Sequence, residues 1–258
     1  MGFLTDLVGA IRRDLARSPL DESRLLARAL ALPPPRDLVA AVRGADPRPG
    51  LIAEVKRASP SSGTIAPDAD PAALAAAYEE AGALGVSVLT EPRHFQGSLA
   101  DLALARRRTT LPVLRKDFLV LPSQVIESRA AGADAVLLIA TALPGPELGA
   151  MLETAKDLGL AALVEAHDGP GLERALASGA ELVGVNARDL ESLGVDTERA
   201  LALAAEVPPD RLLVMESGIA TRDEVKRAGA AGARAVLVGE VLVRSGGPGA
   251  KARELLGG

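Results

Sequence analysis

The scarcest polar residues of the chain lie at the ends of short apolar runs. Of its 29 basic residues only five are lysines, and the sequence contains a single asparagine. Two of these lysines, Lys56 and Lys116, and the asparagine, Asn186, each come at the end of a run that is typical of a buried β-strand. Their equivalent positions indicate a shared polar site rather than chance placement.

Carboxylates occupy the same kind of position. Glu54 lies two residues before Lys56, so both side chains leave one face of a strand, and Glu165 and Glu216 end two later runs. An ion pair would explain any one of these residues. Together with the lysines and the asparagine, these carboxylates make six polar residues on five strands. Such a set favours a reaction site, because burying several charges together is costly unless they pair or serve a reaction. Proton transfer is the chemistry that such a set can do.

A second pattern is compatible with phosphate binding. Two of the later runs end in Ser217-Gly218 and Gly239-Glu240, where glycine allows an anion to approach the backbone closely. Glycine is also common in plain strand-to-helix turns, so both interpretations stay open. The Ser59–Gly63 stretch offers further hydroxyl donors or is an ordinary flexible loop. The cation for a phosphate would be Lys56 or Arg188.

The elements that must position these residues recur along the chain after residue 50. Strand-like runs rich in β-branched and apolar residues come roughly every 20–35 residues, with helical stretches such as 71–81 and 171–177 between them. The predicted strands are Leu51–Lys56, Val86–Glu91, Val113–Phe118, Ala135–Ala140, Ala161–Ala166, Leu182–Ala187, Leu212–Gly218 and Ala235–Glu240.

Gly-Ala pairs close the helical stretches before four of the strands, at Gly82, Gly132, Gly179 and Gly232. Glycine just past a helix end accepts the left-handed conformation that terminates the helix. Apolar strands that alternate with helices imply a parallel sheet covered by helices, and eight such units predict a closed (β/α)8 TIM barrel. No GxGxxG motif follows the first strand, which weakens a dinucleotide-binding alternative.

The first 48 residues do not follow the repeat. Apolar spacing predicts one helix that begins near Phe3, a second around Leu25–Leu30 and a short third over 37–42, with the proline run 33–35 ending the second. This segment is too small for its own core. We therefore expect a single domain over 1–258, with 1–48 as a helical extension packed on the barrel. Periodicity does not settle which end of the barrel it covers.

Composition excludes several classes of protein. The net charge of −5 argues against nucleic acid or an anionic membrane as a partner, and no run approaches the length of a membrane span. Without cysteine there is no disulfide framework or thiolate metal site, and the two histidines, His94 and His167, have no clustered partners at ligand spacing. We expect a cytoplasmic protein, a monomer or weak homodimer, with no metal.

At these residues the sequence resembles the indole-3-glycerol-phosphate synthase family. The resemblance covers nearly the whole chain, including the helical extension. The segments that carry it are Ile52–Gly63 (IAEVKRASPSSG), Leu89–Ser98 (LTEPRHFQGS), Leu111–Phe118 (LPVLRKDF), Ala131–Ile139 (AGADAVLLI), Leu163–Asp168 (LVEAHD), Gly184–Leu190 (GVNARDL), Glu216–Ile219 (ESGI) and Val236–Glu240 (VLVGE).

This resemblance implies a lyase of tryptophan biosynthesis that needs no cofactor. Its substrate would be 1-(2-carboxyphenylamino)-1-deoxyribulose 5-phosphate, closed to an indole with loss of carbon dioxide and water. By the same resemblance Lys116 is the general acid and Glu165 serves the proton transfers of the dehydration. Lys56 binds the substrate carboxylate or shares the acid role, and Glu54 holds Lys56 charged and oriented.

The resemblance also assigns binding residues. Asn186 and Glu216 would position the anilino and sugar groups, and Ser217 would help to close the site. The substrate-binding and phosphate-binding set is completed by Ser59, Arg188, Gly218, Gly239, Glu240, Phe95, Phe118 and Leu137. Its phenylalanines and leucine would form the apolar slot for the aromatic ring.

Three positions depart from the family pattern without removing a proposed catalytic group. Ala187 follows the sixth-strand asparagine where the family has Asn or Ser, His94 replaces an aromatic residue, and Met215 replaces a small polar one. Rival phosphosugar barrels fit less well. An epimerase needs a His/Asp metal set, a phosphoribosyl isomerase a Cys–Asp or Asp–Asp pair, and tryptophan synthase α a Glu–Asp pair. A catalytically silent barrel would have no reason to keep Lys56, Lys116 and Glu165.

Overall fold

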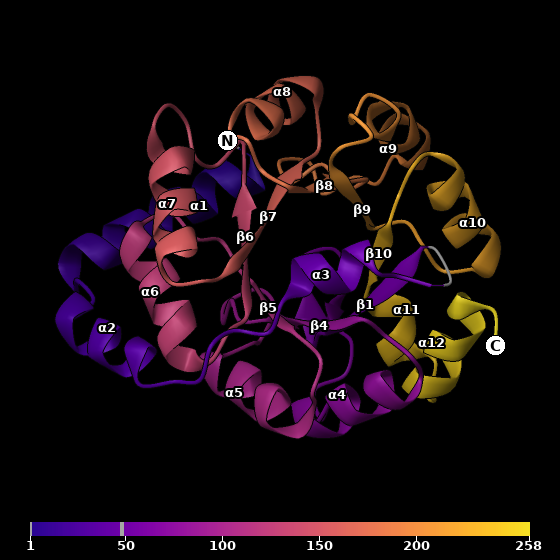
Figure 1. The fold of residues 1–258 in the computed structure, drawn as a ribbon, viewed down its shortest axis with the longest axis horizontal. Coiled ribbons are helices and arrows are strands. Elements are labelled where there is room, and N and C mark those ends of the chain that lie inside the picture. Colours follow the sequence, from indigo (N-terminus) through magenta and orange to yellow (C-terminus); the bar gives the residue numbers. More distant parts are fainter. Residues whose placement is uncertain (1, 47–48) are drawn as a thin grey trace.

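The computed structural model describes residues 2–46 and 49–258, and its centre is a closed barrel of parallel strands (Figure 1). Neighbouring strands around the barrel follow the order β1-β10-β9-β8-β7-β6-β5-β4. Their bounds are Gly50–Val55 (β1), Gly85–Leu89 (β4), Val113–Lys116 (β5), Ala135–Ile139 (β6), Ala161–Ala166 (β7), Leu182–Asn186 (β8), Leu212–Glu216 (β9) and Ala235–Val238 (β10). The predicted (β/α)8 TIM barrel is confirmed.

Helices surround the barrel in Figure 1 and bury the outward-facing strand residues. Along β6, for example, Val136 and Leu138 join the core between strands and helices, whereas Leu137 and Ile139 belong to the core inside the barrel. The helices are Pro71–Glu80 (α4), Leu99–Arg108 (α5), Pro122–Ala131 (α6), Glu147–Asp157 (α7), Gly169–Ala177 (α8), Thr197–Ala204 (α9), Arg222–Ala230 (α10), Glu240–Arg244 (α11) and Pro248–Leu256 (α12).

Local chemistry sets where these helices begin and end. Asp70 accepts a hydrogen bond from the backbone N–H of Ala72, and the Thr221 hydroxyl and Glu224 form a reciprocal capping box at the start of α10. The four glycines of the Gly-Ala pairs are all left-handed, with φ between +79° and +99°. The predicted helix-ending role of these glycines is therefore confirmed.

The predicted strands begin within one residue of the observed ones but most of them run one or two residues too far. The run predicted to end at Phe118, for example, ends as a strand at Lys116. Its apolar pattern continues because Phe118 leaves the sheet and lines a cavity at the barrel mouth. The stretch 58–64 contains a short hairpin, Ala58–Ser59 (β2) and Gly63–Thr64 (β3), which was not predicted from the sequence.

The N-terminal extension forms three helices, Phe3–Arg17 (α1), Glu22–Leu30 (α2) and Leu38–Arg43 (α3). At the mouth of the barrel, the backbone N–H groups of Phe3 and Leu4 donate to the carbonyls of Glu191 and Leu190. At the opposite end, Leu38 is fully buried, and its Cδ1 lies so near the start of β4 that a Cβ added to Gly85 would be 3.0 Å from it. The extension therefore contacts both ends of the barrel, while α2 packs beside α6 (Figure 1).

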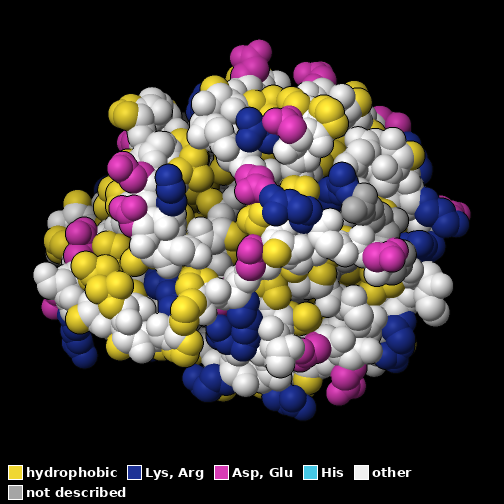
Figure 2. Space-filling model, in the orientation of Figure 1, with side chains coloured by type: hydrophobic (Ala, Val, Ile, Leu, Met, Phe, Trp, Pro, Cys, Tyr) yellow, Lys and Arg dark blue, Asp and Glu magenta, His cyan; other side chains and the backbone are white. Residues whose placement is uncertain are grey.

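Acidic and basic side chains are interspersed on the face shown in Figure 2, and hydrophobic side chains gather over α2. Leu30 of that helix is 71% exposed. Within residues 2–46 and 49–258, no helix has the length and apolar character needed to cross a membrane.

Candidate active site

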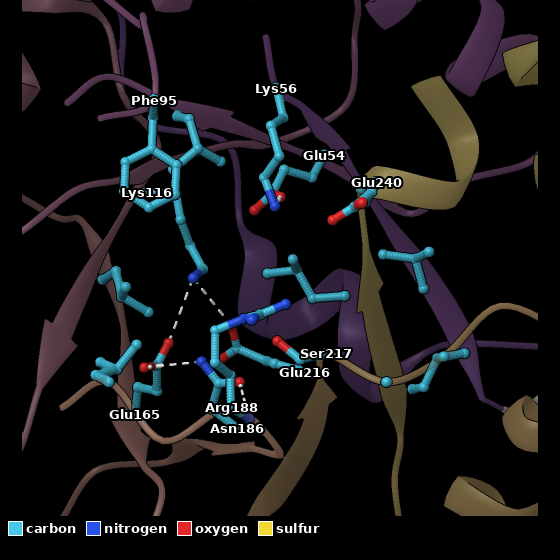
Figure 3. Close-up of a pocket in the computed structure, with 18 of the residues that line it drawn as sticks. Glu54, Lys56, Phe95, Lys116, Glu165, Asn186, Arg188, Glu216, Ser217 and Glu240 are labelled. Atoms are coloured by element: carbon cyan, nitrogen blue, oxygen red, sulfur yellow. Dashed lines mark hydrogen bonds and ion pairs between the residues drawn. The ribbon is translucent and has the colours of Figure 1, made fainter. Parts of the chain in front are cut away.

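A cavity opens at the C-terminal ends of the strands, where catalytic sites of (β/α)8 barrels are built. Every residue assigned to the site from the sequence lines this cavity except Ser59 (Figure 3). These lining residues are Glu54, Lys56, Phe95, Lys116, Phe118, Leu137, Glu165, Asn186, Arg188, Glu216, Ser217, Gly218, Gly239 and Glu240.

Lys116 lies between two buried carboxylates at the centre of the cavity. Its Nζ is 3.4 Å from Oε2 of Glu165 and 3.3 Å from Oε2 of Glu216, as the dashed lines in Figure 3 show. Burial alone would lower the pKa of Lys116, but the negative charges of Glu165, Glu216 and Glu54 raise it above its ordinary value. The ammonium is therefore kept charged in a nearly dry environment, where it can donate a proton or stabilise a developing oxyanion.

Glu216 carries the largest carboxylate shift that is resolved in the cavity. Burial first, and then the charge of Glu165, raise its pKa from the ordinary 4.5 to about 8, although Lys116 acts in the opposite direction. Its Oε1 is buried and has no hydrogen-bond partner within the described part of the chain. Gly184 makes room for this oxygen, because a Cβ at that position would lie 2.5 Å from it. The buried carboxyl group of Glu216 therefore releases its proton less readily than an exposed glutamate does.

Asn186 orients the carboxylate of Glu165. Its Nδ2 donates to Oε1 of Glu165 at 3.1 Å, and its Oδ1 accepts from the backbone N–H of Arg188 at 2.9 Å. Because both ends of the amide are occupied, its orientation is defined. The guanidinium of Arg188 is in turn held by the carbonyl of Leu193 at 2.7 Å. Asn186 therefore connects the loop after β8 to the carboxylate of Glu165.

Lys56 and Glu54 form a separate ion pair on another wall of the cavity, with Lys56 Nζ 2.8 Å from Glu54 Oε1. Glu54 is almost fully buried, while the Lys56 side chain keeps 16% of its surface exposed. Gly239 is required here, because a Cβ at residue 239 would lie 2.4 Å from Glu54 Oε1. The ammonium of Lys56 is thus held at the cavity rim, where it can meet an anionic substrate group.

The loop after β9 has two successive left-handed residues. Ser217 has φ +63° and Gly218 has φ +69°. Such a conformation costs a residue with a side chain about 1 kcal/mol or more, and it is concentrated at functional sites. A Cβ on Gly218 would lie 2.7 Å from Thr197 Oγ1, so glycine is needed there for space as well as for conformation.

Two of the three phenylalanines of the chain, Phe95 and Phe118, line the apolar wall of the cavity, and the third, Phe3, packs against Phe118. The ring centroids of Phe95 and Phe118 are 6.0 Å apart, and Phe3 of α1 packs edge-on against Phe118 at 6.2 Å. Phe3 also meets His94 edge-on at 5.0 Å. The departure at His94 therefore preserves ring packing, through a partner from the extension that was not assigned to the site from the sequence.

Other residues around the site were not predicted. Arg115 and Asp117 flank Lys116, and they form a buried ion pair at 2.9 Å, while Asp117 also accepts from the backbone N–H of Phe118. Glu91 accepts from the backbone N–H groups of His94 and Phe95 and so shapes the loop that carries the Phe95 ring. All three residues lie inside the segments that resemble the family, so the sequence pointed to their neighbourhood. Residue type alone does not show whether such a residue contacts the substrate or only holds its neighbours in place.

Ser59 does not line the cavity. It is buried in β2, where its hydroxyl accepts from the backbone N–H of Ser62 at 3.2 Å. It is Ser62 that reaches the cavity wall, since its hydroxyl donates to Glu240 Oε1 at 2.9 Å. Within the described ranges, no three His, Asp or Glu side chains come together as a set that could hold a metal ion.

Buried, paired acids and bases in a cavity at the C-terminal mouth define this molecule as a (β/α)8-barrel enzyme. Comparison with known proteins gives the family. The chain belongs to the indole-3-glycerol phosphate synthase family, whose profile matches residues 6–255. Proteins of that name are 50% identical to it in a Nocardioides species (100% of this chain, 99% of the relative) and 52% identical in a Parafrankia species (96% and 92%).

Solved structures that it resembles show the fold alone. A 3-hexulose-6-phosphate synthase matches with a TM-score of 0.63 at 16% identity, covering 80% of this chain and 97% of that one. A tryptophan synthase complex from Pyrococcus furiosus matches with a TM-score of 0.60 at 17% identity, covering 81% and 98%. These identities support the barrel and carry nothing about the reaction.

Proposed function

We propose that this chain is a carbon–carbon lyase of tryptophan biosynthesis. It converts 1-(2-carboxyphenylamino)-1-deoxyribulose 5-phosphate to indole-3-glycerol phosphate, carbon dioxide and water. The observation that carries the proposal is the Lys116 ammonium held between Glu165 and Glu216 beside an aromatic wall. Family membership over residues 6–255 supports the same reaction.

Ring closure needs an acid at the substrate carbonyl. As the aromatic carbon attacks the ketone carbon, Lys116 donates a proton to the carbonyl oxygen, which becomes a hydroxyl. The carboxylate then leaves as carbon dioxide, and its bonding electrons restore the aromatic ring. A buried ammonium that is fixed by two carboxylates suits this step, because it is already oriented and needs no solvent reorganisation.

Dehydration then removes the new hydroxyl as water and leaves the indole double bond. This step needs one group to protonate the departing oxygen and another to take the proton from the substrate. Glu165, oriented by Asn186, serves these proton transfers. Lys56 either binds the substrate carboxylate or shares the acid role, with Glu54 orienting it through their ion pair. Glu216 and Asn186 position the sugar and anilino groups.

The phosphate and the aromatic ring occupy different parts of the cavity in this proposal. Phe95, Phe118 and Leu137 form the slot for the ring. The phosphate lies by the loops after β9 and β10, where Gly218 and Gly239 expose backbone. Arg188 or Lys56 supplies the positive charge and Ser217 closes the site, while Ser59 acts through the loop that follows β1.

The decisive experiment incubates the purified chain with the carboxyphenylamino-deoxyribulose phosphate, without added metal, and follows indole fluorescence. We expect a signal that persists in the presence of a chelator. The matched control is Lys226→Ala, a surface lysine that pairs with Asp223 away from the cavity, which should react as the wild type does. A folded wild-type chain that produces no indole would overturn the proposal.

We further propose that residues 1–258 act as one domain in the cytoplasm, as a monomer or a weak homodimer. Support for one domain comes from the extension, whose Leu4, Leu7 and Leu38 belong to the same buried cluster as the barrel interior. Sedimentation velocity at micromolar concentration measures the oligomeric state, and a stable larger assembly would contradict it.

A further inference from the structure

Glu240 lies at the phosphate end of the cavity but its hydrogen bonds point to the protein. Its Oε1 accepts from Ser62 Oγ and from Arg244 Nε, each at 2.9 Å. Figure 3 shows Glu240 and Lys56 on the same side of the cavity, across from Glu165. A carboxylate in this place repels a phosphate dianion, so Glu240 is not suited to binding the phosphate directly.

Ser62 connects Glu240 to the loop that follows β1. This loop carries Lys56 at its start and the β2–β3 hairpin, and Ser62 lies at the turn of that hairpin. Inside the turn, Ser62 N–H donates to Ser59 Oγ. On its other side the loop is anchored by Arg57, whose guanidinium forms two hydrogen bonds with Asp101, at 2.6 and 2.8 Å. Glu240 is therefore the anchor on the β10 side.

The charge of Glu240 is maintained by the same contacts. Burial would raise its pKa, but the hydrogen bonds from Ser62 and Arg244 and the nearby charge of Lys56 together lower it below its ordinary value. A fully ionised acceptor makes the stronger kind of hydrogen bond. The Lys56 ammonium thus lies between two carboxylates, Glu54 in direct contact and Glu240 at longer range.

We propose that Glu240 is a positioning residue that holds the β2–β3 hairpin against the cavity rim through Ser62, and so keeps Lys56 in place for the substrate. This role rests on the proposed function for its kinetic consequence. It assigns to Glu240 an indirect part in substrate binding, through the loop rather than through the phosphate. The hairpin residues themselves need not touch the substrate.

The kinetic test compares single and double variants. Ser62→Ala and Glu240→Ala should each raise KM about threefold to tenfold, the effect of losing one typical hydrogen bond, with kcat within about twofold. The double variant should be no worse than Glu240→Ala, because both changes remove one interaction. Glu240→Gln keeps an acceptor oxygen for Ser62 and should raise KM less than Glu240→Ala. Ser61→Ala is the control, because the Ser61 hydroxyl belongs to the same turn and contacts Ser59 Oγ at 3.4 Å but not Glu240, and it should leave KM unchanged.

Hydrogen exchange supplies a readout that needs no activity. Amides of residues 57–66 should exchange faster in Ser62→Ala and Glu240→Ala than in wild type or Ser61→Ala. An inactive wild type with this exchange pattern would contradict the proposed function and leave the anchor standing. Unchanged exchange, or KM effects of the two single variants that multiply in the double variant, would overturn the anchor itself.

Discussion

Lys116 Nζ and Glu216 Oε2 lie 3.3 Å apart at the centre of the cavity, and the environment raises the pKa of both side chains. For the lysine, three carboxylates outweigh burial, whereas for the glutamate burial and Glu165 outweigh the lysine. The result is an ammonium beside a buried carboxyl group that releases its proton less readily than an exposed glutamate does. Both groups can therefore take part in protonating the carbonyl oxygen and then the hydroxyl.

Lys116→Ala should lower kcat by about 10²–10⁴-fold, the usual contribution of a positioned general acid. We expect the variant to fold, because Glu216 can keep its proton and so avoid two adjacent buried charges. Single-turnover indole formation and circular dichroism measure the two effects. Turnover close to that of the wild type would remove Lys116 from the acid role.

Glu216→Gln should change how stability depends on pH. The folded protein holds a proton on Glu216 up to about pH 8, whereas the unfolded chain releases it near the ordinary 4.5. The stability that the raised pKa of Glu216 contributes is fully present below the ordinary pKa of 4.5 and is lost as the pH rises towards about 8. Urea unfolding between about pH 5 and about pH 8 should show the wild type losing a few kcal/mol relative to the variant. Parallel curves would contradict the raised pKa.

Asn186→Ala should lower kcat by roughly 10-fold to 10²-fold, since a carboxylate misplaced by about 1 Å loses that much. The amide that it removes is the one that orients Glu165. The double variant Asn186→Ala/Glu165→Gln should lose little more kcat than Glu165→Gln alone, because both changes affect the same function. Independent, multiplying losses in the double variant would show that Asn186 acts elsewhere.

Gly184→Ala and Gly149→Ala form a matched pair. A Cβ at Gly184 would lie 2.5 Å from Glu216 Oε1, so the variant should lose about 1–3 kcal/mol of stability together with activity. Gly149 lies inside α7, where an added methyl group would have nothing within 4 Å, and alanine there should add about 0.5–1 kcal/mol. Thermal unfolding and initial rates measure both, and equal effects at the two positions would refute the packing argument.

The barrel could be predicted because its strands are buried on both faces and its helices end at glycines. The polar residues could be found because a charge at the end of an apolar run is unusual wherever it occurs. What could not be predicted was which of two neighbouring polar residues reaches the cavity. Ser62 rather than Ser59 contacts Glu240, because the β2–β3 turn, which periodicity does not reveal, directs the two hydroxyls differently.

Contacts that depend on how the elements pack could not be predicted from the sequence either. Phe3 packs on Phe118 only because α1 docks at the barrel mouth, and the spacing of apolar residues in an amphipathic helix does not identify the surface that it covers. Arg115 and Asp117 were visible as part of a family-like segment. Their buried pairing depends on neighbouring helices and strands, whose positions apolar spacing does not give.

The extension bears on how the chain assembles. Its first residues leave the ribosome early, yet the carbonyls that accept from Phe3 and Leu4 belong to the loop after β8. Leu38 likewise requires the first strands to be in place before it can be covered. We therefore expect α1 to dock only after the loop that follows β8 has been synthesised, with its apolar face exposed until then, which makes nascent chains that stop before that loop prone to aggregate.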